Sequence, residues 1–290
     1  CQVRDARNPI VSCVGEPSSG HETRDPATDL SAPIPRRVLV VGAGPAGLEA
    51  ARIAATRGHS VTVVETNEVG GLAAVSGPGR PLVDWLVREC EILGVRLRAG
   101  VSADEWARLA PDHDLVVQAT GSRRGDADYT IGRGAVVLDV ADVHQGRVAL
   151  PDTGDVAVLD PIGGPIGVAL AEELGARAVL VTPDNIAGNE LSRTGDLAPA
   201  NVRLAQKGVR VERRCIVRSI DMHADVSVVR IQDRFSGETR NLAVAAVVDA
   251  GFRLPTEALP HEGVVAVGDC VAPRTLYEAI LEGRRTGAGI

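Results

Sequence analysis

Short apolar runs alternate with longer stretches of helical spacing along most of the chain. Strands are predicted at residues 37–41, 61–65, 95–99, 115–118, 135–139, 156–159 and 178–181. Helices are predicted at residues 45–57, 80–93, 102–110, 165–174, 196–207 and 275–287. Strands that alternate with helices of this length indicate βαβ units built around parallel sheets.

Two segments depart from this alternation. Residues 1–35 carry turn signals such as Asn8-Pro9 and Asp25-Pro26 with little periodicity, which predicts an extended lead-in segment. Residues 209–249 consist of several short β runs, which predict a meander appended to a second unit.

Composition narrows the class of protein. The 290 residues are 44% apolar and 24% charged, as in a soluble globular protein with one large domain or two of ordinary size. The formal net charge is −7 without a basic patch, which argues against nucleic-acid binding. No apolar run reaches the roughly 18 residues of a membrane span, and no signal peptide opens the chain. We therefore expect a cytoplasmic protein that has no membrane partner.

The cysteines bear on the redox setting. There are five of them, and none forms a CxxC pair, which argues against a disulfide framework and against a thioredoxin-type redox disulfide. This usage also indicates a reducing compartment. The chain begins with Cys1 rather than Met, which suggests a processed or truncated chain.

Residues 38–65 carry the strongest motif. A predicted strand is followed by Gly42, Gly44 and Gly47 in the spacing GxGxxG, with Pro45 and Ala46 between them, and then by a helix and a second strand that ends in Glu65. The glycines permit a tight turn, a close approach of the backbone to a diphosphate, and close packing of the helix on the strand. A carboxylate at the end of the second strand can accept hydrogen bonds from ribose hydroxyls. The motif therefore predicts an adenine dinucleotide site but does not choose between FAD and NAD.

Residues 155–182 repeat this strand, glycine turn, helix and strand. If Gly164 and Gly167 match the second and third glycines, Ile162 stands at the first, where a β-branched residue fits poorly. The second strand ends at Thr182, with neither an acid nor an adjacent arginine to read a ribose. Two interpretations remain open, namely a working NAD(P)H domain with a variant loop and a similar scaffold that binds no nicotinamide.

Two later segments bear on the cofactor. Ala119-Thr120-Gly121 follows a predicted strand, and Gly268-Asp269-Cys270 precedes the last predicted helix. An ATG turn in mid-chain followed by a late GD turn resembles the flavoproteins that contain two dinucleotide-binding domains. In that group the ATG segment closes the FAD domain, and the aspartate of the GD turn contacts the flavin side of the cofactor.

The lead-in segment sharpens this resemblance. Cys1 and Cys13, spaced C-x(11)-C and followed by Glu16-Pro17, resemble the linker of the Old Yellow Enzyme-related NADH:flavin oxidoreductase family, which includes 2,4-dienoyl-CoA reductase and trimethylamine dehydrogenase. Its members join an FMN-binding TIM barrel to a C-terminal half like this chain, with a 4Fe-4S cluster held by four cysteines between the parts. The resemblance covers essentially all 290 residues but only the C-terminal portion of the usual enzyme. Glu16 is a departure, because the family more often has Asn there.

The resemblance implies a set of site residues. Cys1 would be the third cluster ligand and Cys13 the fourth, and these two alone cannot complete a four-thiolate site. No residue is assigned as a catalytic acid, base or nucleophile, because the family handles its substrate on the barrel. The candidate cofactor contacts are Gly42, Gly44, Pro45, Ala46, Gly47, Glu65, Gly71, Leu72, Arg80, Val101, Ala119, Thr120, Gly121, Gly164, Gly167, Gly268 and Asp269.

The resulting expectation is an α/β fold with two Rossmann-like domains of the glutathione-reductase type, the second inserted into the first. Residues 1–35 would form the lead-in with a remnant of the iron–sulfur motif. Residues 36–122 and 260–290 would form the FAD-binding domain, and residues 123–259 would form the NAD(P)-binding-like domain.

The function implied by the resemblance is electron transfer. Electrons would pass from NAD(P)H via FAD to the iron–sulfur cluster and FMN of the missing N-terminal barrel, where an unsaturated carbonyl compound is reduced or an amine is oxidised. Two alternatives remain open. One is a non-catalytic scaffold of an amine-dehydrogenase-like enzyme that binds ADP only, and the other is a free-standing NAD(P)H:acceptor flavin reductase. The small-molecule substrate would bind on the barrel, and a homo-oligomer is compatible with the sequence.

Overall fold

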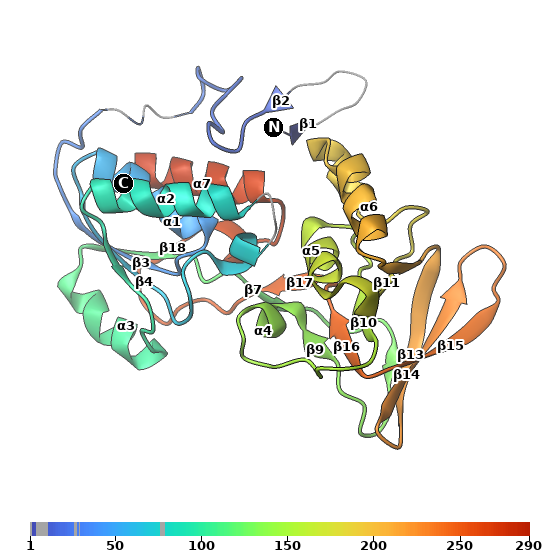
Figure 1. Cartoon of the computed structure of the whole chain (residues 1–290). Coiled ribbons are helices and arrows are strands. Elements are labelled where there is room, and N and C mark those ends of the chain that lie inside the picture. Colours follow the sequence, from blue (N-terminus) through green and yellow to red (C-terminus); the bar gives the residue numbers. More distant parts are fainter. Residues whose placement is uncertain (1, 4–10, 26–27, 29, 76–78) are drawn as a thin grey trace. The chain divides into compact units, whose positions relative to one another are not determined.

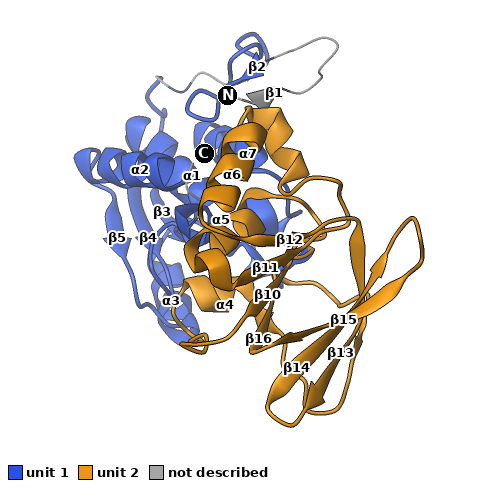
Figure 2. Ribbon diagram, turned by 45° about the vertical axis from the view of Figure 1, so that its right-hand side comes forward, with its two compact units in different colours: residues 1–123, 253–290 blue, residues 124–252 orange. Residues whose placement is uncertain are grey.

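The computed structural model describes residues 2–3, 11–25, 28, 30–75 and 79–290. The chain folds into two compact units, which Figures 1 and 2 show. Unit 1 comprises Cys1–Arg123 and Arg253–Ile290, and unit 2 comprises Arg124–Phe252. The second unit is therefore inserted between two pieces of the first, as the sequence predicts.

The core of unit 1 is a five-stranded parallel sheet in the order β18-β6-β3-β4-β5. Its strands are β3 (Arg37–Val41), β4 (Ser60–Val64), β5 (Arg96–Arg98), β6 (Leu115–Gln118) and β18 (Val265–Ala266). Three long helices, α1 (Pro45–Thr56), α2 (Arg80–Ile92) and α7 (Leu276–Gly289), lie on one face of the sheet, and α3 (Ala103–Leu109) lies on the other (Figure 1). Short 3-10 turns are η1 (Gly71–Val75), η2 (Ala110–Asp112) and η5 (Gly268–Cys270).

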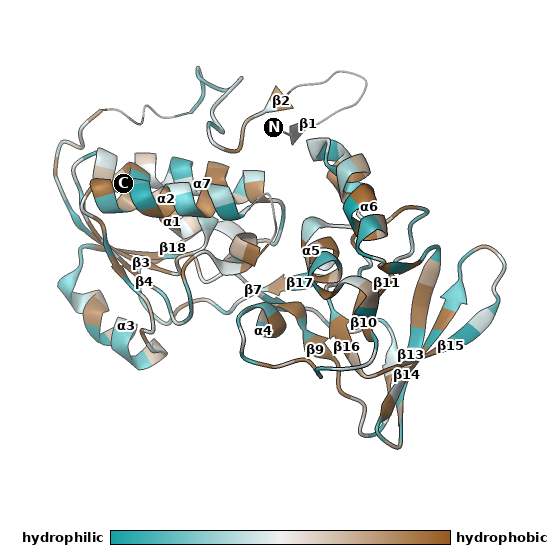
Figure 3. Cartoon of the chain, viewed as in Figure 1, coloured by the Kyte–Doolittle hydropathy of each residue, from teal (hydrophilic) through white to brown (hydrophobic). Residues whose placement is uncertain are grey.

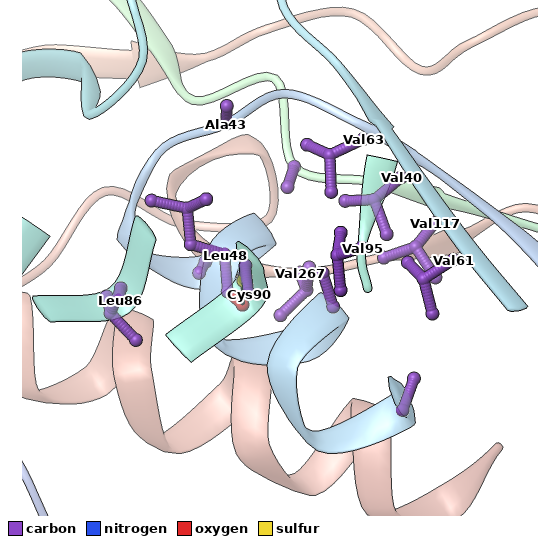
Figure 4. Close-up of a cluster of buried hydrophobic side chains, with 14 of the residues drawn as sticks. Val40, Ala43, Leu48, Val61, Val63, Leu86, Cys90, Val95, Val117 and Val267 are labelled. Atoms are coloured by element: carbon purple, nitrogen blue, oxygen red, sulfur yellow. Dashed lines mark hydrogen bonds between the residues drawn. The ribbon is translucent and has the colours of Figure 1, made fainter. Parts of the chain in front are cut away.

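Side chains of β3 alternate between the two faces of the sheet. Val38 and Val40 pack with Leu48 and Leu86 of the helical layer, whereas Leu39 packs in the cluster of α3. A parallel strand that is covered on both faces has a continuous apolar sequence, which is why residues 38–41 show no alternation of polar and apolar residues. Figure 4 shows the helical side of this core.

Helices α1 and α7 pack closely because α7 presents glycines to α1. A Cβ added at Gly283 would lie 2.4 Å from the carbonyl oxygen of Ala46, and one at Gly287 would lie 2.6 Å from that of Ala50. The close contact brings the C-terminal helix against the first turn of α1. The late segment of the chain is thereby built into the same edge of the sheet as the early glycine motif.

The lead-in segment is held on α7. Strand β1 (Gln2–Val3) pairs with β2 (Val11–Ser12), and the Tyr277 hydroxyl donates to the carbonyl oxygen of Pro17 at 3.0 Å. Arg284 forms an ion pair with Glu16 and a second one with the buried Glu49, the latter at 3.0 Å. These contacts place the residues around Cys13 in unit 1.

Unit 2 repeats the architecture with a second parallel sheet, in the order β12-β11-β10-β16-β9. Its strands are β9 (Leu138–Asp139), β10 (Val156–Leu159), β11 (Ala178–Val181), β12 (Arg210–Glu212) and β16 (Ala246–Asp249). Its helices are α4 (Val140–His144), α5 (Pro165–Leu174) and α6 (Leu197–Gln206), with 3-10 turns η3 (Gly175–Arg177) and η4 (Asn189–Thr194). The expected α/β fold with two Rossmann-like units is therefore confirmed.

The predicted meander forms a second sheet of unit 2. Strands β13 (Cys215–His223), β14 (Val226–Asp233) and β15 (Thr239–Val244) are antiparallel, and β8 (Thr130–Ile131) adds at the edge. The apolar run after residue 240 is split, because β16 leaves the meander and joins the parallel sheet beside β10. Figure 3 shows the contrast, with hydrophobic residues along β16 and mostly hydrophilic ones along β15.

Two expectations are corrected by long-range contacts. The predicted strand at 135–139 is reduced to Leu138–Asp139. Residues 253–259, which were expected in the second domain, belong to unit 1. The reason is Gln118, whose buried side chain donates to the carbonyl oxygen of Glu257 at 2.8 Å and accepts from the amide of Leu259 at 3.0 Å. The connecting strands β7 (Ser122–Arg124) and β17 (Arg253–Pro255) also pair.

We expect Gln118→Ala to destabilise unit 1 by about 1–3 kcal/mol, because it removes the buried side-chain amide that bonds the Leu259 amide and the Glu257 carbonyl oxygen. Urea unfolding followed by circular dichroism measures the effect. Gln206→Ala, at an exposed position of α6, is the control. Equal midpoints for the two variants would contradict the assigned role of Gln118.

In the part of the chain that the structure describes, none of the helices combines the length and the apolar composition needed to cross a bilayer.

Candidate cofactor site

The loop after β3 closes only with glycines at two of its positions. Gly42 has φ 111°, and a Cβ there would lie 2.2 Å from the carbonyl oxygen of Ala119. A Cβ at Gly47, in the first turn of α1, would lie 2.0 Å from the carbonyl oxygen of Gly42. These two glycines are therefore required by packing within the protein itself.

Gly44 is different, because no contact with the described residues requires it to be glycine. Its φ is −75°, and a Cβ added there would meet no heavy atom within 4 Å. The residue is the N-cap of α1, whose N-terminus has no side-chain cap and no acid in its first turn. The backbone therefore offers unblocked amides and the positive end of the helix dipole, which suits a diphosphate.

Glu65 links the end of β4 to this loop. Its carboxylate accepts the amide of Ala43 at 2.8 Å and the amide of Asn67 at 2.9 Å. The side chain is only partly buried, and a carboxylate retains lone pairs for further donors such as ribose hydroxyls.

Two further turns meet the same loop. A Cβ at Gly71 would lie 3.7 Å from the Cα of Gly44, and a Cβ at Gly268 would lie 2.6 Å from the Cβ of Ala46. The segments after β3, after β4, around Gly71 and around Gly268 therefore converge on the N-terminus of α1. The sequence spreads them over more than two hundred residues, and the parallel sheet brings them to one edge.

Asp269 follows Gly268 on the turn η5. Burial raises the pKa of its carboxyl group, against the lowering effect of the Arg274 amide and the Ser122 hydroxyl, which donate to it at 3.3 and 3.4 Å. The neighbouring Cys270 is buried, and its thiol donates to the carbonyl oxygens of Gln118 and Val267. Burial also raises the pKa of this thiol, so Cys270 fills the core rather than presenting a thiolate.

Other predicted contacts lie further from the loop or face elsewhere. Arg80 begins α2 at the surface and pairs with Asp84 at 3.0 Å. Val101 is 4% exposed and packs in the cluster of α3, although its amide donates to the carbonyl oxygen of Glu65. The Thr120 hydroxyl contacts that of Thr256 at 2.6 Å, and Leu72 is partly buried in η1. The roles of these residues in cofactor binding stay predictions.

Of the two proposed cluster ligands, the structure describes only one. Cys13 is a free, half-buried cysteine, and Cys1 lies outside the described residues. Among residues 2–3, 11–25, 28, 30–75 and 79–290, no group of three or more His, Cys, Asp or Glu side chains could hold a metal ion. Cys1 and Cys13 alone cannot complete a four-thiolate site.

The loop of unit 2 corrects the glycine alignment. The amide of Gly42 donates to Val64 at the end of β4, and in unit 2 the amide of Asp160 donates in the same way to Val181 at the end of β11. Asp160, rather than Ile162, therefore stands in the place of the first glycine. The loop from there to the N-cap Gly164 is two residues longer than its counterpart, and counting back from Gly167 could not reveal this.

Sequence reasoning also missed two arginines. Arg213 and Arg214 line a shallow hollow of about 390 Å³ together with Asn185, which follows β11. They are not adjacent to Thr182 in the sequence, because they follow β12, and the pairing of β12 with β11 brings the two strand ends together. Two guanidinium groups at this edge suit a phosphate group.

Comparisons with known proteins agree with this geometry. Residues 9–158, a little more than half of the chain, match the family described as pyridine nucleotide-disulphide oxidoreductase. The chain is 37% identical over 194 residues to the probable N-methylproline demethylase of Rhizobium meliloti, covering 63% of this chain and 28% of that protein. It is 30% identical over 304 residues to the N,N-dimethylglycine/sarcosine dehydrogenase of Chromohalobacter salexigens, covering 86% and 43%. The chain thus spans less than half the length of these relatives.

The fold also resembles solved structures. A 2-naphthoyl-CoA reductase in complex with 2-naphthoyl-CoA superposes with a TM-score of 0.80 at 26% identity, over 97% of this chain and 44% of that one. The similarity therefore extends over both units of this chain and over less than half of the larger enzyme.

Proposed function

Because the chain belongs to the pyridine nucleotide-disulphide oxidoreductase family, we propose that it is the flavin-binding module of an oxidoreductase, in which unit 1 holds FAD and unit 2 receives NAD(P)H. The observation that carries the flavin part is Gly44. This glycine is not needed for internal packing, and it lies where four segments converge on an uncapped helix N-terminus. Such a position is explained by a ligand whose phosphates approach the backbone.

The residues of unit 1 would bind and orient the cofactor. The amides around Gly44 would take the diphosphate, Glu65 the adenosine ribose, and the turn of Gly268 and Asp269 the flavin side. When bound, FAD would supply the redox chemistry, because its isoalloxazine ring accepts a hydride and passes electrons on. Glu282 accepts the amide of Gly268 at 2.9 Å and so fixes the turn that would carry Asp269.

The terminal reaction is proposed from the resemblance and from the relatives, whose names describe amine demethylation, amine dehydrogenation and acyl-CoA reduction. We propose that this module serves an FMN-bearing barrel that binds the small-molecule substrate. Cys1 and Cys13 would supply two thiolates of a 4Fe-4S cluster, and cysteines from outside this sequence would supply the others.

A second candidate function is a scaffold that binds ADP in unit 1 and no nicotinamide in unit 2. The observation that favours it is Asp160, a carboxyl group at the place of the first glycine in the loop of unit 2. The absorbance spectrum of the purified protein separates the two functions. Flavin absorbance that is bleached anaerobically by NADH or NADPH supports the flavin-binding module. A colourless protein that releases ADP on denaturation refutes the flavin-binding module and supports the scaffold.

We expect Gly44→Val to lower FAD affinity at least a hundredfold while leaving the apoprotein folded. The added side chain would enter the space where the diphosphate would lie, and it meets no protein atom at its Cβ. Flavin content after reconstitution with FAD, and the melting temperature of the apoprotein, are the measurements. Gly289→Val is the matched control, since a Cβ there also meets nothing within 4 Å but lies at the end of α7. Unchanged FAD binding in Gly44→Val would exclude this loop as the site.

A further inference from the structure

Asp160 is a buried acid at the end of β10. Its side chain is 1% exposed, and its Oδ1 accepts the amide of Gly163 at 2.9 Å. Its Oδ2 is also buried and has no hydrogen-bond partner among the described residues. The carboxyl group is therefore held inside the glycine loop of unit 2 rather than at its solvent side.

The carboxyl group lies under the first turn of α5. A Cβ added at Gly167 would lie 2.9 Å from the Cγ of Asp160, whereas the equivalent Cβ at Gly47 of unit 1 would meet backbone and Ala119. Helix α5 has no side-chain cap at Gly164 and no acid in its own first turn. Asp160 therefore places a negative charge at the N-terminus of α5. In unit 1 the first turn of α1 contains no acid.

The electrostatics of the loop follow from this burial. Burial and, to a smaller extent, the nearby Asp184 raise the pKa of Asp160 to about 7, although the amides of Gly163, Gly164 and Ile162 lower it. The Oδ2 of Asp184 would lie 2.9 Å from a Cβ at Gly163, so this second acid lies beside the loop. The carboxylate thus uses amides that in a nucleotide-binding loop would face the diphosphate.

Further charged groups surround the loop. The Oδ1 of Asp249 on β16 would lie 2.6 Å from a Cβ at Gly251, which would also contact Pro161 of the loop. Asp249 is paired with Arg124 at 3.4 Å. On η4, Glu190 donates its amide to the carbonyl oxygen of Gly163 and pairs its side chain with Arg193 at 3.0 Å.

We infer that Asp160 is an internal anion that occupies the diphosphate-binding amides of unit 2, so that a pyridine nucleotide binds there only when this carboxyl group is uncharged or removed. The inference rests on the proposed role of unit 2 as the nucleotide-binding unit. Two anions compete for one set of amides, and each also repels the other. Protonation of Asp160 removes the repulsion. Substitution of the carboxyl group by a side chain without an acceptor also frees the amides.

Titration calorimetry with NADH and with NADPH at pH 6 and pH 8 tests the inference on the whole chain. The variants are Asp160→Asn, which removes the charge and keeps the shape, and Asp160→Ala, which also removes the acceptor. We expect the wild type to bind up to about tenfold more tightly at pH 6 than at pH 8, because the uncharged fraction of a group with a pKa of about 7 falls about tenfold over this range. Asp160→Asn should bind at least tenfold more tightly than the wild type at pH 8 and show no such pH dependence, and Asp160→Ala should bind at least as tightly. Asp152→Asn, at an exposed position before β10, should behave as the wild type does.

Wild-type binding that is equally tight at both pH values overturns the inference, and so does equal binding by the wild type and both variants. Absence of binding by all of them also overturns it, because something other than Asp160 would then exclude the nucleotide. FAD content, measured in the same samples, reports separately on the proposed function. Loss of FAD with restored nucleotide binding would refute the role of unit 1 and leave the role of Asp160 intact.

Discussion

Gly47→Ala is expected to destabilise unit 1 by about 3 kcal/mol or more and to abolish flavin binding, because the new Cβ would stand 2.0 Å from the carbonyl oxygen of Gly42. The backbone of Gly42 cannot move away easily, because it already lies close to the carbonyl oxygen of Ala119. Urea unfolding followed by circular dichroism, and flavin absorbance of the purified variant, measure the two effects.

Gly44→Ala is the matched control for this substitution, because its Cβ meets no heavy atom within 4 Å. We expect it to cost about 1 kcal/mol or less, as for an exchange of glycine for alanine at an N-cap. The pair separates the glycine that lets the helix pack from the glycine that lets a ligand approach. If Gly47→Ala were as stable as Gly44→Ala, the close contact with Gly42 would not be a constraint on this fold.

The second large effect concerns Asp160 and pH. Its pKa is raised to about 7 in the folded chain, from 3.8 as the ordinary value. A group with a raised pKa contributes stability that is fully present below about pH 4 and is lost as the pH rises through about 7. We therefore expect the melting temperature of the wild type to fall, relative to that of Asp160→Asn, between about pH 4 and pH 7. The difference in unfolding free energy should change by up to about 1.4 kcal/mol per pH unit in that window and level off above it.

Differential scanning calorimetry at pH 5, 6, 7 and 8 measures this difference, with Asp152→Asn as the control for removal of an exposed charge. Melting curves of the wild type and Asp160→Asn that shift in parallel over this range would show that Asp160 keeps an ordinary pKa in the folded state. The expected pH dependence of stability also connects with binding. The folded chain with a protonated Asp160, which predominates below pH 7, is the form expected to admit a nucleotide.

The two units thus share one supersecondary structure and differ in what lies at its glycine loop. In unit 1 the first turn of α1 contains no acid, and the acid near the loop is Glu65, which follows the neighbouring strand β4. In unit 2 the acid lies inside the loop. A bound anion would pair with free amides at the loop of unit 1. At the loop of unit 2 it would have to displace the carboxylate of Asp160.

Local pattern determined much of the fold. The apolar run of β3, the spacing from Gly42 to Gly47 and the acid at Glu65 are contiguous features, and a strand, turn and helix form from contacts within such a segment. The insertion of one unit into the other was also predicted, but from the resemblance to flavoproteins in which an ATG turn, here at Ala119, closes the first domain and a GD turn, here at Gly268, follows late in the chain.

Only the tertiary structure decided which residue of unit 2 stands at the end of β10. Spacing counted back from Gly167 chose Ile162, but strand pairing fixes the position, and the hydrogen bond from the Asp160 amide to Val181 shows a loop that is two residues longer. The boundary after Phe252 depends likewise on Gln118, whose partners follow it by 139 and 141 residues. By itself the sequence determined the βαβ units and the first glycine loop, because these are set by neighbours along the chain. Register, loop length and the burial of a charge were decided by contacts between distant segments, which no local pattern encodes.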